Sequence, residues 1–177
     1  MTHAPTLHSE RLVLRPHRQE DFLACRMLWS DAEVVRHIGG ATQDTQAVWF
    51  RMLRYAGMWQ LLGYGMWVVE DCATGAFLGE AGLLSACRGI AELEGVPEIG
   101  WVFLPSAWGR GIASEAVGAV LRWADAHIDA PAIRCIIEGD NVASFRVAGK
   151  QGFSSIGKAL IDGTPVEILD RSRASAG

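Results

Sequence analysis

The chain has 177 residues, of which half are hydrophobic and a fifth are charged. This length and composition fit one compact domain with an ordinary core. The formal net charge of -4, with no run of basic residues, argues against a nucleic-acid binder that works by neutralising phosphates. We therefore expect a single domain over residues 1–177, ordered from about residue 7 to residue 170, with no nucleic-acid partner.

The cysteines and the hydropathy pattern indicate the cellular compartment of the protein. The four cysteines are far apart and form no Cys-x-x-Cys pair, so the sequence signals neither a metal site nor a disulfide framework. No window has the apolar length of a signal peptide or of a membrane span. We therefore expect a protein of the reducing cytoplasm, with no resident metal and no membrane partner.

The first part of the chain predicts a strand followed by helices. Residues 7–16 alternate apolar and polar side chains and stop at a proline, as a half-buried strand does. Residues 19–31 have apolar side chains at helical spacing after an acidic first turn. Residues 31–40 resemble a short helical turn closed by two glycines, and a longer helix is expected from Asp44 to about Leu62.

The middle of the chain predicts a hairpin and a central strand. Residues 65–70 and 76–84 are strand-like runs separated by a turn, which indicates an antiparallel pair. Residues 85–95 are charged and aperiodic and are interpreted as a variable loop. Residues 96–104 are apolar and are expected to form the central strand.

The last part of the chain returns to the sheet. A helix is expected from about Arg110 to His127, because its apolar residues share one stripe. The strand that follows, over residues 131–138, must then run parallel to the central strand. A helix capped by Asp140 or Asn141 and a hairpin over residues 153–169 complete the fold.

The stretch 108–113, with the sequence Trp-Gly-Arg-Gly-Ile-Ala, joins the central strand to the long helix. The first amides of a helix lack acceptors within the helix, and they lie at the positive end of its dipole. Glycines let a ligand approach the main chain without meeting a Cβ. The stretch therefore predicts an anion site suited to phosphate.

Two motifs carry a resemblance to a known family. Residues 108–113 resemble the acyl-coenzyme A pyrophosphate loop, Gln/Arg-x-x-Gly-x-Gly/Ala, of the GNAT superfamily of N-acetyltransferases. Trp108 departs from the usual first residue, but a Trp-Gly-Lys/Arg-Gly-x-Ala form is common in the RimJ/RimL-like subgroup. Residues 141–144 and 150–153 are similar to the family segments Asn-x-x-Ser and Lys-x-Gly-Phe, and residues 10–15 are similar to the opening strand of the subgroup.

The resemblance implies a fold and a reaction. The fold is of the α/β (α+β) class, with a mixed, mostly antiparallel sheet of six to seven strands, about four helices and a splayed central parallel pair. The reaction moves an acetyl group from acetyl-coenzyme A to a primary amine on a protein N-terminus or a small molecule, in an enzyme that is a possible homodimer. The alternative is a non-catalytic module of the same fold that binds acyl-coenzyme A.

The implied contacts with acetyl-coenzyme A fall into three groups. The main-chain amides at the start of the long helix are placed on the diphosphate, the central strand on the pantetheine arm, and the next helix on the arm and the sulfur. In this order, the groups are Gly109, Arg110, Gly111, Ile112, Ala113 and Ser114; Val102, Phe103 and Leu104; and Asn141 and Ser144.

The candidate catalytic residues are Glu98 and Ser144. Burial among apolar neighbours would raise the pKa of a carboxylate such as Glu98 and suit it to act as a base, although a glutamate on a strand is also commonly exposed or salt-bridged. Ala148 stands where many family members have a tyrosine acid, so the thiolate leaves unassisted or with a hydrogen bond from Ser144. The Val102 amide is expected to meet the oxyanion if the strand bulges. Because Cys135 has no patterned base, direct attack by the amine is expected.

The acceptor is less well defined by the sequence. The helical region and the central strand offer candidate contacts, although tryptophans are more often core residues and a lone histidine is more often a surface or capping residue. An aminoglycoside would need several glutamates between residues 70 and 98 to converge, whereas the subgroup also includes enzymes for peptides, amino acids and small amines. The candidate acceptor contacts are Trp29, Arg36, His37, Trp49, Trp59 and Trp101.

Overall fold

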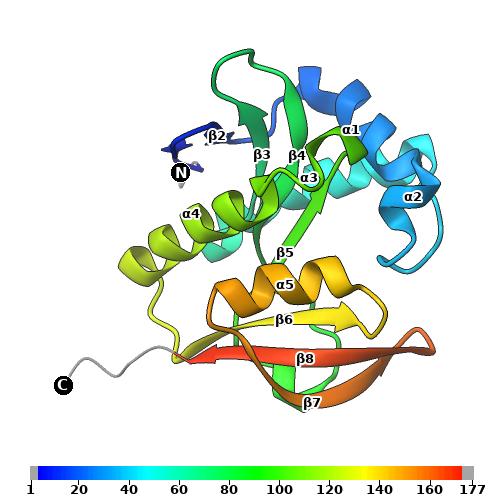
Figure 1. Ribbon diagram of the computed structural model, residues 1–177, viewed down its shortest axis with the longest axis vertical. Helices are drawn as coiled ribbons and strands as arrows, with labels where there is room; N and C mark the ends of the chain where they lie inside the picture. The colour runs from blue at the N-terminus through cyan, green and yellow to red at the C-terminus, as the bar shows by residue number, and fades with distance from the viewer. Residues whose placement is uncertain (1–3, 173–177) are drawn as a thin grey trace.

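The computed structural model describes residues 4–172, which build one eight-stranded sheet with helices on both faces (Figure 1). The strand order is β1-β2-β3-β4-β5-β6-β8-β7, and only β5 and β6 pair in parallel. The strands are β1 (Leu7–His8), β2 (Leu12–Arg15), β3 (Met66–Asp71), β4 (Phe77–Leu84), β5 (Glu98–Phe103), β6 (Ala132–Glu138), β7 (Ser154–Ile161) and β8 (Thr164–Ser172). The α-helices are α1 (Phe22–Ser30), α2 (Ala32–Val35), α3 (Thr45–Leu62), α4 (Ile112–His127) and α5 (Val142–Lys150).

The predicted fold class is confirmed, with one more strand and one more helix than expected. The additional strand arises because the expected first strand is two short antiparallel strands, β1 and β2. Glu115 on α4 holds the turn between them, since its Oε1 accepts from Ser9 Oγ at 2.7 Å and from the Arg11 amide at 2.8 Å. Such a long-range contact leaves no periodic signal in the sequence, so the turn was missed.

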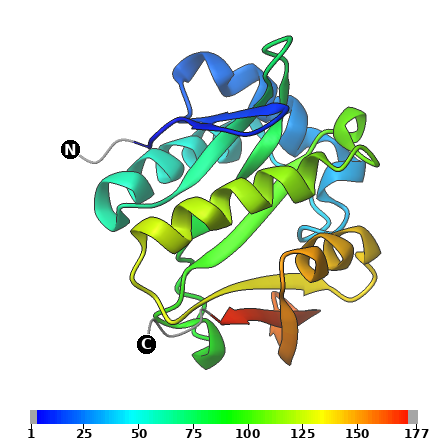
Figure 2. The same cartoon turned by 60° about the vertical axis from the view of Figure 1, so that its left-hand side comes forward.

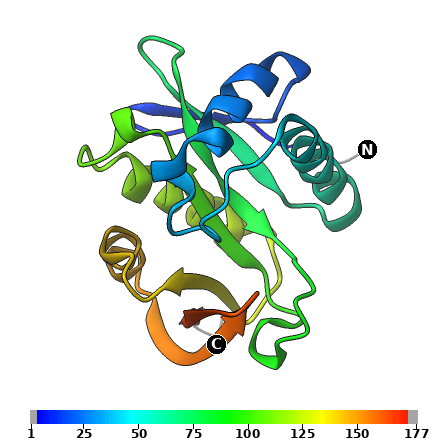
Figure 3. The ribbon, with the colours of Figure 1, turned by 90° about the vertical axis from the view of Figure 1, so that its right-hand side faces the viewer.

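The two faces of the sheet are covered differently. Helix α4 lies across one face, over the larger hydrophobic cluster, while α1, α2 and α3 lie on the opposite face (Figures 2 and 3). Trp59, Trp67 and Trp123 meet edge to face within the larger cluster, with ring centroids 4.6 to 5.4 Å apart. The expected role of Trp59 in acceptor binding is therefore wrong, because its side chain belongs to the core.

Strands β5 and β6 separate soon after they begin. Their register holds one pair, Glu98 with Arg134, and the Arg134 amide donates to Pro97 O at 3.0 Å. Beyond this point the two strands diverge toward their carboxyl ends (Figure 2). The splayed parallel pair that the resemblance implied is confirmed, and it leaves one edge of β5 without a neighbouring strand.

The ends of the elements follow local chemistry. Helix α4 begins at Ile112, because Gly111 has a left-handed φ of +77°. Strand β8 runs to Ser172, two residues past the expected limit of the ordered chain, and the rest of the expected fraying lies outside the described residues. Among the residues that the structure describes, no helix combines the length and the apolar character needed to cross a membrane.

Candidate active site

The loop that precedes α4 presents main-chain donors to solvent. Within the described chain, the amides of Ile112, Ala113 and Ser114 have no hydrogen-bond acceptor, and Glu115 donates the first bond of the helix, to Gly111 O at 3.1 Å. Gly109 also has a positive φ, of 69°, and a Cβ there would meet no atom within 4 Å. Free amides at the positive end of a helix dipole, beside open main chain, fit a diphosphate.

Side chains around the loop fix its shape. The Trp108 indole Nε1 donates to Phe103 O at 2.8 Å, which ties the loop back to the end of β5. Arg11 Nη1 donates to Arg110 O at 2.9 Å, and Arg110 Nη1 donates to Ser106 O at 3.2 Å. Trp108, which replaces the usual Gln or Arg of the motif, therefore has a defined structural role in closing the loop.

The edge of β5 that faces β6 determines which amides can meet a ligand. The Leu104 amide donates to Leu78 O on β4 at 2.9 Å. Alternate residues of a strand direct their main-chain groups to opposite edges, so the Val102 amide also faces β4, whereas those of Trp101 and Phe103 face the open edge. The β4–β5 register is continuous, so the bulge needed for Val102 to meet an oxyanion does not occur.

The start of α5 lies at the same end of the sheet. Asn141 Oδ1 accepts from the Ser144 amide at 3.1 Å, which makes Asn141 the cap of the helix. Gln151 Nε2 donates to Ser114 O at 3.1 Å and ties α5 to the first turn of α4. Ala148 is fully buried in the core. The residues expected at the sulfur are thus on an element that is anchored to the loop.

Glu98, the expected base, lies where β5 and β6 join. It is buried, with 6% of its surface exposed. Arg88 grips its carboxylate at both oxygens, with Nε to Oε2 at 3.1 Å and Nη2 to Oε1 at 2.9 Å. The hydrogen bonds that Arg88 donates to Glu98 raise the pKa of Arg88 against the effect of burial. The loop of residues 85–95, interpreted only as variable, therefore supplies a partner that the sequence did not reveal.

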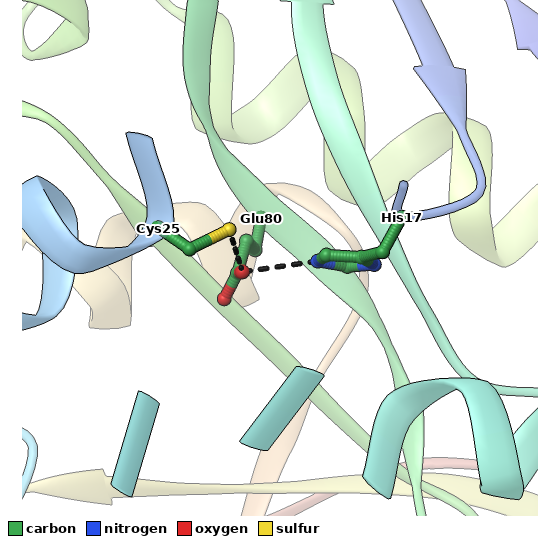
Figure 4. A group of neighbouring side chains, drawn as sticks. All are labelled: His17, Cys25 and Glu80. Atoms are coloured by element: carbon green, nitrogen blue, oxygen red, sulfur yellow. Dashed lines mark hydrogen bonds and ion pairs between the residues drawn. The ribbon is translucent and has the colours of Figure 1, made fainter. Parts of the chain in front are cut away.

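A second carboxylate, Glu80, entered the sequence analysis only as one of the glutamates that an acidic cleft would need, and its burial was not predicted. It lies on β4, on the face covered by α1 and α3, and is fully buried. Oε1 contacts His17 Nε2 at 3.0 Å and accepts from Cys25 Sγ at 3.3 Å (Figure 4). Oε2 accepts from Trp29 Nε1 at 2.9 Å and from the Tyr55 hydroxyl at 3.4 Å. The sequence signal for this buried carboxylate was a single glutamate within an otherwise apolar strand.

Three of these partners, His17, Trp29 and Cys25, keep Glu80 ionised. Complete burial alone would raise the pKa of Glu80, but the hydrogen bond and charge of His17, with the hydrogen bonds from Trp29 and Cys25, hold it below its ordinary value. Burial and the nearby negative charge of Glu80 raise the pKa values of Cys25 and Tyr55, so both stay protonated as donors. The result is a buried negative charge with a full set of donors.

The expected acceptor tryptophans do not converge. Trp29 is buried with Val102 in the cluster under α1–α3, and its ring nitrogen is committed to Glu80. Trp101 packs against the larger cluster, on the α4 side of the sheet. Trp49 meets the Phe22 ring edge to face at 5.5 Å and lines an open cavity of about 460 Å³. The three side chains therefore occupy different surroundings.

The remaining acceptor candidates lie after α2. Arg36 is exposed. His37 Nδ1 lies 3.1 Å from Asp140 Oδ1, and the Gly39 amide donates to Glu138 Oε1 at 3.1 Å. These contacts join the segment after α2 to the carboxyl end of β6, so His37 is close to the start of α5. Sequence spacing alone gave no sign of this bridge.

The two buried cysteines, Cys25 and Cys135, do not offer a ready nucleophile. Cys25 and Cys135 are buried and Cys72 and Cys87 are exposed, all as free thiols. Burial, with the nearby charge of Glu98, raises the pKa of Cys135 to about 12. This thiol is protonated at neutral pH and is a poor nucleophile, in line with the expected direct attack.

A helix-end anion site beside a splayed parallel pair defines the class of this molecule as a GNAT-type acyltransferase. The chain belongs to the GNAT acetyltransferase family, because the family model described as an acetyltransferase (GNAT) domain matches residues 11–154. It is similar to an uncharacterized N-acetyltransferase, YoaA, of Bacillus subtilis. The two are 27% identical over 154 residues, which is 86% of this chain and 85% of that protein.

Solved structures share the fold. A putative GnaT-family acetyltransferase from Bordetella pertussis has a TM-score of 0.84 and 26% identity, over 96% of this chain and 100% of that one. RimL, a ribosomal L7/L12 alpha-N-protein acetyltransferase solved with coenzyme A, has a TM-score of 0.78 and 17% identity, over 95% of this chain and 98% of that one. The expected likeness to RimL is thus confirmed at the level of the fold.

Proposed function

We propose that this protein transfers an acetyl group from acetyl-coenzyme A to a primary amine by direct attack. The observation that carries the proposal is the set of free amides of Ile112, Ala113 and Ser114 beside the open edge of β5. The amides suit the diphosphate, and the edge suits the amide-bearing pantetheine arm. Coenzyme A in the RimL structure, which shares this fold, supports the same ligand.

We assign each step of the reaction to particular residues. The Trp101 and Phe103 amides, on the open edge of β5, are placed to bind the arm and the thioester carbonyl oxygen as charge develops on it. The neutral amine attacks the carbonyl carbon, the C–S bond breaks, and the thiolate leaves. Glu98 takes the proton that the amine nitrogen loses, either directly or through a water. Ser144 supplies a hydrogen bond to the departing sulfur.

A non-catalytic module that binds acyl-coenzyme A is the second candidate. The bidentate contact between Arg88 and Glu98 favours it, because both oxygens that would take the proton already accept hydrogen bonds from the guanidinium. Titration calorimetry with acetyl-coenzyme A, followed by thiol release with a panel of amines, separates the two. Heat with thiol release supports the enzyme, heat without release supports the module, and no heat with any acyl-coenzyme A contradicts both.

Substituting Glu98 by glutamine is expected to lower turnover at neutral pH by about 100-fold or more, the usual contribution of a general base. Affinity for acetyl-coenzyme A should be unchanged. The control is Arg88→Gln, which frees the carboxylate and should keep or raise turnover. If both variants lose activity equally, or if the pH–rate profile of Glu98→Gln matches that of the unmodified protein, the pair is structural and Glu98 is not the base.

The acceptor and the cellular compartment are proposed from the partners of the glutamates and from the state of the cysteines. Glu70, Glu80 and Glu98 each have a separate partner, which argues against a converged acidic cleft for an aminoglycoside. A peptide N-terminus or a small amine is the proposed acceptor. We place the protein in the cytoplasm, because the cysteines of the described chain are all free thiols. A homodimer is also proposed, and its test is the mass of the protein in solution.

A further inference from the structure

Arg51 on α3 differs from the other partly buried arginines. In the described chain, arginines on several elements have a carboxylate partner within 3 Å, as expected for a charge removed from water. Arg51 has none, although its side chain is only partly exposed. The arginines that do form ion pairs are Arg11, Arg15, Arg88, Arg134 and Arg171.

The Arg51 guanidinium is held in place but is incompletely bonded. Its central carbon lies 3.7 Å from the centre of the Trp29 ring. Nη1 donates to the Tyr55 hydroxyl at 3.3 Å. Nε is buried without an acceptor, and no other buried side-chain nitrogen or oxygen in the described residues lacks one. Nη2 has no hydrogen-bond partner in the described chain and is not among the buried atoms, so the guanidinium keeps an accessible donor that an anion can bind.

The guanidinium lies on the side of the sheet opposite the diphosphate loop. Trp29 and Tyr55, which hold it, both donate to Glu80. Glu80 pairs in register with Val102 on β5, and Trp29 packs in the same cluster as Val102. Arg51 is therefore one layer of side chains away from the strand on which the thioester is proposed to lie, and it approaches from the face that α4 does not cover.

We propose that Arg51 binds the carboxylate of the acceptor, and that the acceptor is a free amino acid. This proposal rests on the proposed acetyltransferase function. A guanidinium stacked on an aromatic ring presents a fixed fork of donors that matches a carboxylate. In a free amino acid the carboxylate lies one carbon from the amine, so the same contact orients the amine for attack. A peptide N-terminus has an amide there instead and cannot form the ion pair.

A structural role for Arg51 is the rival explanation. Its charge is linked through Tyr55 to the carboxylate of Glu80, which supplies a counter-charge without direct contact. In that case the substitution of Arg51 would loosen α3 on the sheet and affect every acceptor to the same extent. The two roles therefore differ in whether the loss depends on the carboxylate of the acceptor.

The test compares acceptors that differ only in the carboxylate. Thiol release from acetyl-coenzyme A is measured with leucine, methionine, phenylalanine and glutamate, each beside its carboxamide, for the unmodified protein, Arg51→Met and Arg51→Lys. Arg54→Met, on the exposed side of the same helix, is the matched control. We expect Arg51→Met to lower kcat/KM for the preferred acid by about 10- to 100-fold, as loss of a charged hydrogen bond does, and to leave its amide unaffected. Arg51→Lys should retain part of the preference.

A binding measurement keeps this proposal separate from the proposed function. Calorimetry of the same acids against the protein with coenzyme A added should show binding that Arg51→Met loses and Arg54→Met keeps. Binding without thiol release would contradict the acetyltransferase function but support the Arg51 site. An unmodified protein that binds or acetylates amides and peptides as well as acids overturns the proposal, as does an equal loss on acid and amide in Arg51→Met.

Discussion

Substitution of Gly111 by valine is expected to weaken binding of acetyl-coenzyme A by about 10- to 100-fold while the fold is kept. Gly111 has a φ of +77° and precedes the first turn of α4. A β-branched residue avoids this left-handed region, at a cost of about 1 to 2 kcal/mol for a side chain with a Cβ. The loop would relax toward negative φ and turn the amides of Ile112 and Ala113 away from the diphosphate. Titration calorimetry with acetyl-coenzyme A measures the loss.

The control uses the same substitution at a glycine remote from the site. Gly163 has a φ of +82° in the turn between β7 and β8, and a Cβ there would meet no atom within 4 Å. Gly163→Val should therefore lose a similar amount of folding stability and bind acetyl-coenzyme A as tightly as the unmodified protein. Equal affinity in folded Gly111→Val would show that the diphosphate binds elsewhere.

The features predicted from sequence are those with a local cause. Gly109 and Gly111 were identified because glycines let a ligand approach the main chain where the first amides of a helix are free. The structure adds that both have a left-handed φ. Asp44 was expected to begin a helix, and Asp140 or Asn141 was expected to cap another; in the structure the side chains of Asp44 and Asn141 each accept from an amide three residues ahead. Short-range geometry of this kind is determined by neighbouring residues, so the order of the elements was largely predictable.

The features missed depend on partners distant in the chain or on strand geometry. Arg88 comes from a loop without periodicity, so its grip on Glu98 could not be seen beforehand. The direction of the Val102 amide follows from the β4–β5 register, which is fixed only when both strands are placed. Trp101 alternates with Val102 along β5, so it points away from the cluster in which Val102 packs with Trp29. The expectation that these tryptophans share one groove neglected that alternation.

The contacts of Glu80 show how residues distant in the sequence hold the helices on the face of the sheet opposite α4. Its partners come from the segment after β2, from α1 and from α3, so one carboxylate ties three separate parts of the chain to β4. Helix α3 carries Arg51, which we propose binds the acceptor, and α1 carries Trp29, on whose ring the Arg51 guanidinium stacks. The Glu80 carboxylate therefore fixes α1 and α3 on the sheet, and with them the side of the site where we propose that the acceptor binds.

Substitution of Glu80 by glutamine is expected to lower the free energy of unfolding by about 3 to 5 kcal/mol, the usual cost of breaking a buried charged network. Glutamine keeps one acceptor oxygen but turns an NH₂ group toward donors such as His17 or Trp29. Denaturant unfolding at neutral pH measures the loss. Glu20→Gln, at an exposed glutamate without a side-chain partner in the described chain, is the control and should change stability by less than about 0.5 kcal/mol.

The pH dependence gives a second test of the same carboxylate. Because the folded protein holds the pKa of Glu80 below its ordinary value of 4.5, the stability from ionised Glu80 is complete above that value. It is lost as the pH falls through the lower pKa of the folded state, where the carboxylate must take up a proton. The unmodified protein should thus lose stability more steeply than Glu80→Gln as the pH is lowered from about 5 to about 3. Parallel curves, or a loss of less than about 1 kcal/mol at neutral pH, would show that Glu80 is not the ionised centre of this network.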